Sequence, residues 1–137
     1  MAVVMDHIVI NVEDDEKMMD FYTRVLGFSP ERFKAYRTGR VPFPSVRLSD
    51  ETVIDLFPKK IWEKHYASSD KVRPNIHHFC LAVTEAKWKA IKDRLSADGL
   101  PIEEGPVPRW GAYSYGTSIY FRDPENNLIE LRYYDGT

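Results

Sequence analysis

The alternation of polar and apolar residues near the end of the chain predicts a β-hairpin. Residues 118–122 (SIYFR) and 128–133 (LIELRY) alternate between the two classes, which is the pattern of strands with one buried face. Between them, residues 123–127 (DPENN) contain a proline and two asparagines, and these residue types favour tight turns. The second strand carries Glu130 among apolar neighbours. A carboxylate in that position must be hydrated, paired or bound to a metal.

The same patterns divide the whole chain into two runs of elements with one order, β-α-β-β-β. Apolar residues at helical spacing predict a helix at residues 15–26, with Gly27 as its stop. A second helix is predicted between Thr84 and Gly99. Residues 58–74 show no clear periodicity and are predicted to be a connection. The predicted strands are 5–12, 29–36, 45–48 and 51–57 in the first run, and 75–83, 101–104, 118–122 and 128–133 in the second.

Alignment of the two runs places a histidine and a carboxylate at equivalent positions of each. His7 of HIVINV coincides with His78 of HFCLAV, and Asp55 of VIDL coincides with Glu130 of LIEL. In all four strands the residues that face the other way are apolar, so we expect the helix of each run to cover that face. The four polar side chains are then predicted to share the uncovered, concave face of a curved sheet.

Two imidazoles and one or two carboxylates form a ligand set that suits a divalent transition metal such as Zn, Ni, Mn or Fe(II). Open coordination positions at such an ion would admit water or substrate. The alternative interpretation is that each histidine is an ordinary half-buried residue and each acid a hydrated strand residue. The symmetry of the four positions favours the metal site.

Composition narrows the class of protein. The chain has 137 residues, 43% hydrophobic and 29% charged, which is typical of one soluble domain, here expected over residues 1–137 with modules at about 4–57 and 75–135. The net charge of −2, without a basic block, argues against a nucleic-acid partner. The apolar runs are too short to span a membrane, and the first residues lack the charged segment of a signal peptide, so we expect a cytoplasmic protein. The single cysteine, Cys80, excludes an internal disulfide and is predicted to be a buried structural thiol.

Several motifs resemble those of the vicinal oxygen chelate superfamily, which includes glyoxalases, bleomycin-resistance proteins and extradiol dioxygenases. They are DHIVINV, FYTRVLGF and RDPENNLIEL, together with the aligned histidine and acid positions. The segment PIEEGPVPRWGAYSYGTSIYFRDPENNLIEL is similar to the glyoxalase-domain-containing branch. The resemblance covers nearly the whole chain. It implies an α+β fold in which paired βαβββ modules form a cupped eight-stranded mixed sheet around a metal.

The resemblance also implies which residues hold that metal. His7, His78 and Glu130 match the family's ligand positions residue for residue. Asp55 occupies the fourth position, where glyoxalases and epimerases commonly have the longer Glu or Gln. Whether the shorter Asp55 side chain reaches the metal is left open by the resemblance. Phe57 stands where some relatives carry a histidine, so we expect it to form a wall of the substrate site.

Further candidate substrate-binding residues follow from the resemblance and from the pattern. Asn11 stands where glutathione-dependent glyoxalase I has an arginine, which argues against lactoylglutathione lyase activity. Residues 105–116 are predicted to be a Gly/Pro/aromatic loop. This loop is either a lid, with Arg109 for an anionic group and Trp110 and Tyr113 for stacking, or a segment whose aromatics pack at a dimer interface. Tyr120 is placed to donate a hydrogen bond to a substrate.

The leading functional hypothesis is a divalent-metal-dependent enzyme, a lyase or isomerase of glyoxalase type, that acts on a small substrate chelated through vicinal oxygens. Glu130, or Asp55 where it is not a tight ligand, would transfer a proton. The alternatives are an Fe(II) extradiol-type dioxygenase and a metal-free protein that sequesters a drug or metabolite. Short chains of this family usually pair, so we expect a homodimer.

Overall fold

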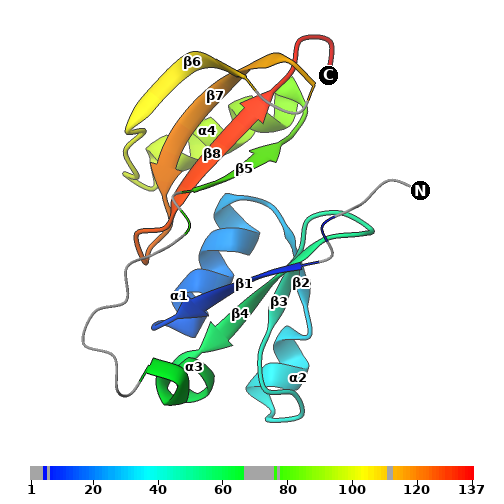
Figure 1. Cartoon of the computed structure of the whole chain (residues 1–137), viewed down its shortest axis with the longest axis vertical. Helices are drawn as coiled ribbons and strands as arrows, with labels where there is room; N and C mark the ends of the chain where they lie inside the picture. The colour runs from blue at the N-terminus through cyan, green and yellow to red at the C-terminus, as the bar shows by residue number, and fades with distance from the viewer. Residues whose placement is uncertain (1–4, 6, 67–75, 77, 111–112) are drawn as a thin grey trace. The chain divides into compact units, whose positions relative to one another are not determined.

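The computed structural model describes residues 5, 7–66, 76, 78–110 and 113–137, and the chain divides into two compact units (Figure 1). The first is Met1–Arg73 and the second is Pro74–Thr137. Each unit is built around one four-stranded mixed sheet. Within the described residues, no helix is long and apolar enough to cross a membrane.

The two sheets have the same strand order. The first sheet runs β1-β4-β3-β2, with β1 parallel to β4 and the other pairs antiparallel. The second runs β5-β8-β7-β6 with the same pattern of directions. The α+β class and the repeated βαβββ order predicted from the sequence are therefore confirmed. The strands are β1 His7–Val12, β2 Ser29–Glu31, β3 Ser45–Arg47, β4 Val53–Pro58, β5 Phe79–Ala82, β6 Glu104–Trp110, β7 Tyr115–Arg122 and β8 Leu128–Tyr133.

In each unit a helix covers the apolar face of the sheet, as the strand alternation predicted (Figure 1). In the second unit this helix is α4 (Glu85–Ala97), whose Trp88, Ile91 and Leu95 are buried. The Trp88 indole also donates a hydrogen bond of 3.0 Å to the Leu131 carbonyl of β8. The buried apolar side chains of the sheets are Ile10, Val12, Val46, Ile54 and Leu56 in the first unit and Ile119, Phe121, Ile129 and Leu131 in the second.

The helix of the first unit changes geometry halfway along. α1 (Asp15–Asp20) is capped by Asp14. The Asp14 carboxylate accepts a hydrogen bond of 3.0 Å from the Lys17 amide, which is typical of an N-cap. The predicted helix then continues as the π-helical turn η1 (Phe21–Val25). Helical structure over the predicted range is confirmed, although a uniform α-helix is not.

Two helices occur where the sequence pattern predicted something else. The predicted strand at residues 29–36 is correct only for β2, because α2 (Phe33–Arg37) follows at once. The predicted connection at residues 58–74 begins with α3 (Lys59–Tyr66). Its Trp62 indole donates to the Val12 carbonyl at 2.9 Å, so a contact distant in sequence holds α3 against the sheet. The remainder of that connection, from residue 67, lies outside the described residues.

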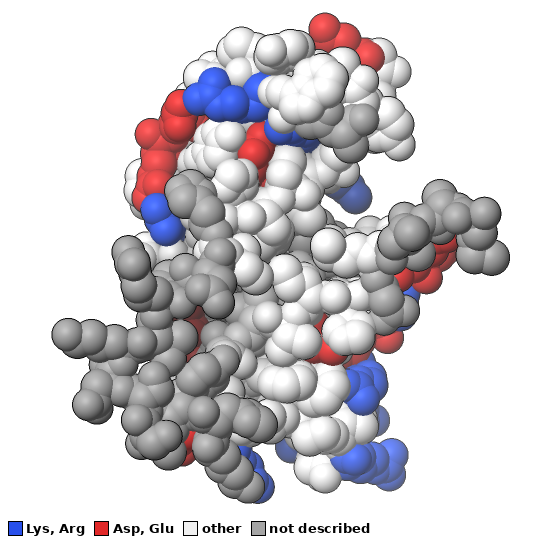
Figure 2. Space-filling model, viewed as in Figure 1, with Lys and Arg blue, Asp and Glu red and all other residues white. Residues whose placement is uncertain are grey.

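The prediction of a loop at residues 105–116 is also wrong, because most of this segment forms β6 and the start of β7. β6 contains Pro106 and Pro108, and these prolines are the reason why the sequence pattern predicted a loop. Since β6 lies at the edge of the second sheet, a residue on its open side needs no amide donor, and proline is tolerated there. On the face seen in Figure 2, acidic and basic side chains are interspersed among the described residues.

Candidate functional site

The hairpin formed by β7 and β8 presents Glu130, and its turn is held by one buried carboxylate. Asp123, which is 4% exposed, accepts hydrogen bonds of 2.9 Å from the amides of Glu125 and Asn127. Its other oxygen accepts from the Asn127 side-chain amide at 2.7 Å. Asn126 takes the left-handed conformation, with φ of 71°, which asparagine tolerates better than most residues. This turn sets the register in which Tyr120 lies opposite Glu130.

Glu130 is buried, at 3% exposure, and both of its carboxylate oxygens have partners. One oxygen accepts hydrogen bonds from the Ser118 hydroxyl at 2.7 Å and from Arg132 at 2.5 Å. The other lies 3.1 Å from Nε2 of His78. Burial alone would raise the pKa of Glu130, but hydrogen bonds from Ser118, Arg132 and Tyr120 outweigh burial and lower the pKa below its ordinary value. The acid in the apolar strand is therefore paired and ionised at neutral pH.

Arg132 is the main partner of Glu130, although the strand alternation, which puts both on one face, assigned it no role. Its guanidinium is buried and donates to Sγ of Cys80 at 3.2 Å, to the Trp110 carbonyl at 3.1 Å and to the Tyr134 hydroxyl at 3.2 Å. Burial would lower the pKa of Arg132, but the hydrogen bond to Glu130 and those to its other partners raise it. The signal that could have found it is its spacing of two residues from Glu130, which puts both side chains on one face of β8.

Tyr120, His78 and Arg109 surround this ion pair on the same face of the second sheet. The rings of His78 and Tyr120 meet edge to face, with centroids 5.7 Å apart. The Arg109 guanidinium lies 5.9 Å from the centre of the Tyr120 ring and forms an ion pair with Glu104. Burial and the neighbouring Glu130 carboxylate raise the pKa of Tyr120, so its hydroxyl stays protonated at neutral pH.

Cys80 lies directly opposite Glu130 in the register of β5 and β8. The predicted burial of this residue is wrong, because Cys80 is exposed. Its thiol nevertheless lies against the sheet face, where partial burial and the charge of Glu130 raise its pKa to about 11. A thiol with that pKa is almost wholly protonated at neutral pH and is a poor nucleophile.

The first unit carries the equivalent histidine and acid in the same relation. Asp55 lies opposite Val9, two residues after His7, just as Glu130 lies opposite Cys80, two residues after His78. Asp55 is half-buried and accepts a hydrogen bond of 2.6 Å from the Ser45 hydroxyl. His7 and Asn11 are exposed on β1.

The surroundings of the two acids differ in chemistry. Since Ser45 pairs with Asp55 and Tyr120 pairs with Glu130, the residues equivalent to Ser118 and Arg132 in the first unit are Phe43 and Phe57. These two rings pack at a centroid distance of 4.8 Å. An aromatic pair thus replaces a hydroxyl and a guanidinium, and Phe57 forms an apolar surface beside Asp55.

The structure brings some of the predicted site residues together and leaves others apart. His78, Tyr120, Glu130 and Arg109 gather on one face of the second sheet. Trp110 and Tyr113 lie near the tip of the β6–β7 hairpin, 70% and 83% exposed. Among the described residues, no group of three or more His, Cys, Asp or Glu side chains is arranged to hold a metal ion. His7 and Asp55 belong to the first unit.

The His78–Glu130 pair has the spacing that two ligands of one metal require. Neighbouring ligand atoms on an octahedral ion with bonds near 2.1 Å lie about 3 Å apart, and Nε2 of His78 is 3.1 Å from the Glu130 oxygen. The second oxygen of Glu130 is held by Ser118 and Arg132, and ligating carboxylates are commonly oriented by such hydrogen bonds. The same separation is that of a direct hydrogen bond between His78 and Glu130, and a tight metal site needs at least one further ligand beside these two.

Comparison with known proteins agrees with this fold. Residues 4–131 match the family model described as the glyoxalase/bleomycin resistance protein/dioxygenase superfamily. The chain belongs to this superfamily. The resemblance deduced from the sequence motifs is thereby confirmed.

Individual relatives cover nearly all of the chain. It is 36% identical over 130 residues to the glyoxalase domain-containing protein RDO1 of Mycosarcoma maydis, which covers 95% of this chain and 68% of that protein. It is 32% identical over 131 residues to virulence protein STM3117 of Salmonella typhimurium, covering 95% and 83%. Among solved structures, an integron cassette protein from the mobile metagenome of V. cholerae superposes with a TM-score of 0.74 at 30% identity, with 98% of each chain covered.

Proposed function

We propose that this protein is a divalent-metal-dependent enzyme, a lyase or isomerase of glyoxalase type, that acts on a small substrate bound through two vicinal oxygens. The observation that carries the proposal is the His78–Glu130 pair, whose nitrogen and oxygen lie 3.1 Å apart. Membership of the superfamily supports the class of reaction.

The residues that would hold the metal are His78 and Glu130 with His7, and Asp55 where its shorter side chain reaches. A bound divalent cation (Zn, Ni, Mn or Fe(II)) would supply Lewis acidity for an enediolate or enolate formed from the substrate. Glu130 enters this site as an anion because its pKa is lowered. Ser118 and Arg132 keep the carboxylate in one orientation, with one oxygen left towards His78.

Other residues of the site would bind and orient the substrate. The Tyr120 hydroxyl, which donates to Glu130 in the protein alone, would turn this single donor to the substrate, and Arg109 would bind an anionic group. Trp110 and Tyr113 supply exposed aromatic surface at the hairpin tip, and Asn11 and Phe57 supply a polar group and an apolar wall. Proton transfer falls to Glu130, or to Asp55 where Asp55 does not bind the metal.

Two other functions are each supported by one observation. A set of His7, His78 and Glu130 is the two-histidine, one-carboxylate set of non-haem Fe(II) oxygenases, which favours an extradiol-type dioxygenase. The full pairing of the Glu130 carboxylate with Ser118, Arg132 and His78, on the other hand, favours a metal-free protein that binds a drug or metabolite. In that case Glu130 is structural and the sheet face is a binding surface.

Metal content separates the two metal-dependent functions from the metal-free binder. The purified chain is loaded separately with Zn, Ni, Mn and Fe(II) and measured by mass spectrometry after removal of free ion. We expect one ion per chain for at least one metal, and a loss of affinity of roughly tenfold or more in His78→Ala and Glu130→Ala, because each removes a ligand.

Glu103→Ala is the matched control, since it removes an exposed carboxylate of the same unit whose partner is Arg122. It is expected to bind metal as the unaltered protein does. Less than stoichiometric binding of every metal by the unaltered protein would refute the enzyme proposal and favour the metal-free binder.

A further inference from the structure

The Arg132 side chain joins Glu130 to the end of β6. A guanidinium has five N–H donors in one rigid plane, and here every nitrogen has its acceptors. They are the Glu130 carboxylate (2.5 Å) and the Trp110 carbonyl (3.1 Å) for Nη2, the Arg109 carbonyl (3.3 Å) and the Tyr134 hydroxyl (3.2 Å) for Nη1, and Sγ of Cys80 (3.2 Å) for Nε. The guanidinium therefore cannot follow one partner without losing another.

The end of β6 is the part of the second sheet that most needs these bonds. β6 lies at the edge of the sheet, and its register with β7 shifts before Val107. Two prolines in the strand supply no amide donors. Arg132 binds the carbonyls of the last two residues of this strand, Arg109 and Trp110. A strand with such interrupted pairing opens locally unless other contacts hold it.

Tyr134 holds the other arm of the hairpin tip. Its hydroxyl accepts a hydrogen bond of 3.4 Å from the Tyr113 amide, and the two rings meet edge to face with centroids 5.3 Å apart. Gly116 leaves room for the Tyr134 ring, because a Cβ at Gly116 would lie 3.2 and 3.3 Å from two of the ring carbons. The residues on both sides of the tip are thus tied to Arg132, either directly or through Tyr134.

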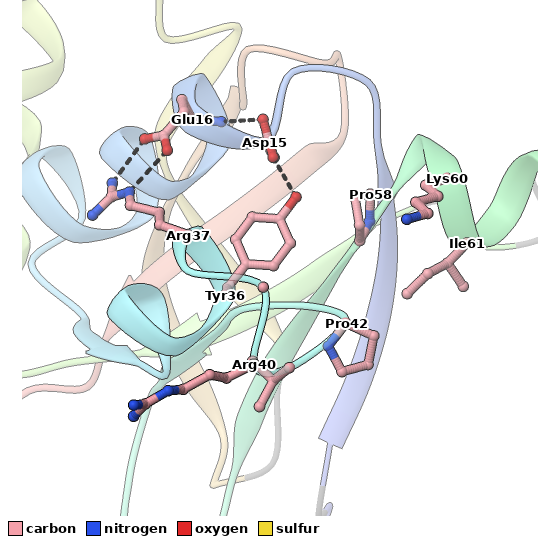
Figure 3. Close-up of a pocket in the computed structure, with 11 residues that line it drawn as sticks. Asp15, Glu16, Tyr36, Arg37, Arg40, Pro42, Pro58, Lys60 and Ile61 are labelled. Atoms are coloured by element: carbon pink, nitrogen blue, oxygen red, sulfur yellow. Dashed lines mark hydrogen bonds and ion pairs between the residues drawn. The ribbon is translucent and has the colours of Figure 1, made fainter.

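Burial makes this linkage stronger than an ordinary surface pair. Arg37 also donates to both oxygens of a glutamate, Glu16, but that pair is exposed on the first unit, where water can replace a lost partner (Figure 3). The Glu130–Arg132 pair is buried. A buried guanidinium that loses its carboxylate is left without a counter-charge, which is costly. It would turn towards water and withdraw its donors from the two carbonyls of β6.

We propose that Arg132 is a positioning residue that couples Glu130 to the tip of the β6–β7 hairpin, so that Arg109 and Trp110 keep their places only while the Glu130–Arg132 pair is intact. The coupling rests on the proposed function for its purpose, because that function assigns Glu130 to the metal and to proton transfer, and Arg109 and Trp110 to the substrate. A change at either end of the guanidinium is transmitted to the other end. The carboxylate and the substrate-binding tip are therefore positioned together.

Trypsin measures whether the end of β6 is held, because it cleaves after Arg109, whose carbonyl Arg132 binds. Cleavage within a folded protein requires local opening, and its rate rises as opening becomes easier. The full chain is digested briefly without metal or substrate, and mass spectrometry follows the fragments 1–109 and 110–137. Arg132→Lys keeps the charge but loses the planar fork. It is expected to raise the rate of this cut roughly tenfold, because two hydrogen bonds from a charged group to β6 are lost.

Glu130→Gln tests the coupling itself, because it changes the partner at the other end of the guanidinium. It is expected to raise the rate of the cut after Arg109 roughly fivefold, since a neutral acceptor holds Arg132 less tightly. In the Arg132→Lys background it is expected to add nothing, because both substitutions act through one group. These outcomes do not require metal. A protein that takes up no metal would refute the proposed function and leave this test unaffected.

Arg122→Lys is the matched control in the same unit. Arg122 also donates to a carboxylate, that of Glu103, and to a backbone carbonyl, that of Asn126. This variant is expected to leave the rate of the cut after Arg109 unchanged.

Cleavage after Lys92 reports unfolding of the whole second unit, because Lys92 lies within α4, whose apolar face is buried. In every variant this cut is expected to stay far slower than the cut after Arg109. Equal rates at the two bonds would overturn the proposal, because Arg132 would then only stabilise the fold. An unchanged cut after Arg109 in Arg132→Lys would also overturn it. So would an absent or fully additive effect of Glu130→Gln, or an equal effect of Arg122→Lys.

Discussion

Glu130 and Arg132 form an ion pair in which each side chain is only 4% exposed. Desolvation of two charges is costly, and hydrogen bonds to both groups offset that cost here. Removal of one member leaves the other charged and buried without its partner. The stability of the second sheet therefore depends on Glu130 and Arg132 being present together.

Arg132→Leu is expected to lower the free energy of unfolding by about 3–5 kcal/mol, because it leaves the Glu130 carboxylate buried without its guanidinium. Urea unfolding followed by circular dichroism measures the change. Arg122→Leu, which removes an arginine whose partner Glu103 is 44% exposed, serves as the control and is expected to cost about 1 kcal/mol or less. Equal losses in the two variants would contradict the assignment.

The pH dependence of the same pair has a definite sign. Because the pKa of Glu130 is lowered in the folded protein, its stabilising contribution is present above its unfolded pKa of about 4.3 and is lost as the pH falls through the folded value. The difference in unfolding free energy between the unaltered protein and Glu130→Gln should therefore shrink as the pH is lowered from neutral into this acidic range. A difference that grows on acidification would contradict the ion pair.

At the scale of elements, the β7–β8 hairpin shows how a short turn positions a functional side chain. Asp123 is the first residue of that turn, and three hydrogen bonds converge on its carboxylate. Without them the register that places Tyr120 opposite Glu130 has weaker support.

Asp123→Ala is expected to destabilise the protein by about 2 kcal/mol, because it leaves the amides of Glu125 and Asn127 without their acceptor. Asn126→Gly is the control in the same turn, since glycine adopts the observed φ of 71° without strain, and its effect should stay within about 0.5 kcal/mol. Thermal unfolding of the two variants measures both effects. A larger loss in Asn126→Gly than in Asp123→Ala would contradict this account.

The elements also differ in how well local pattern predicts them. β7 and β8 follow from alternation because apolar and polar residues occupy opposite faces of each strand, and α4 follows from apolar residues at helical spacing. β6 was missed because its prolines are acceptable only at a sheet edge, and edge position is a property of the whole sheet. α2 was missed because its pairs with Asp15 and Glu16 of α1 link residues distant in sequence.

At the scale of the whole molecule, the resemblance to the superfamily implies a pair of chains. We propose a homodimer, in which the metal site is completed either within a chain or across the interface. Light scattering on the purified protein is expected to give twice the chain mass of 16.0 kDa. A mass equal to that of one chain would contradict the dimer.

Mixing two variants that each lack one proposed metal ligand distinguishes the two arrangements of the site. If sites are shared between protomers, His7→Ala and Glu130→Ala exchanged into mixed dimers should restore metal binding at about one quarter of all sites, because one of the two sites in a mixed dimer keeps every ligand. If each site lies within one chain, the mixture should bind no more metal than the separate variants.

The sequence by itself determined the repeated strand-helix order, the helix-covered apolar faces and the equivalence of His7 with His78 and of Asp55 with Glu130. These features are periodic and local, so the sequence alone predicts them. Only the tertiary structure decided that Arg132 and Ser118 hold Glu130, that Phe43 and Phe57 take their places in the first unit, and that α2 is anchored to α1. Such partnerships join residues on different strands and helices, and packing rather than local pattern brings them together.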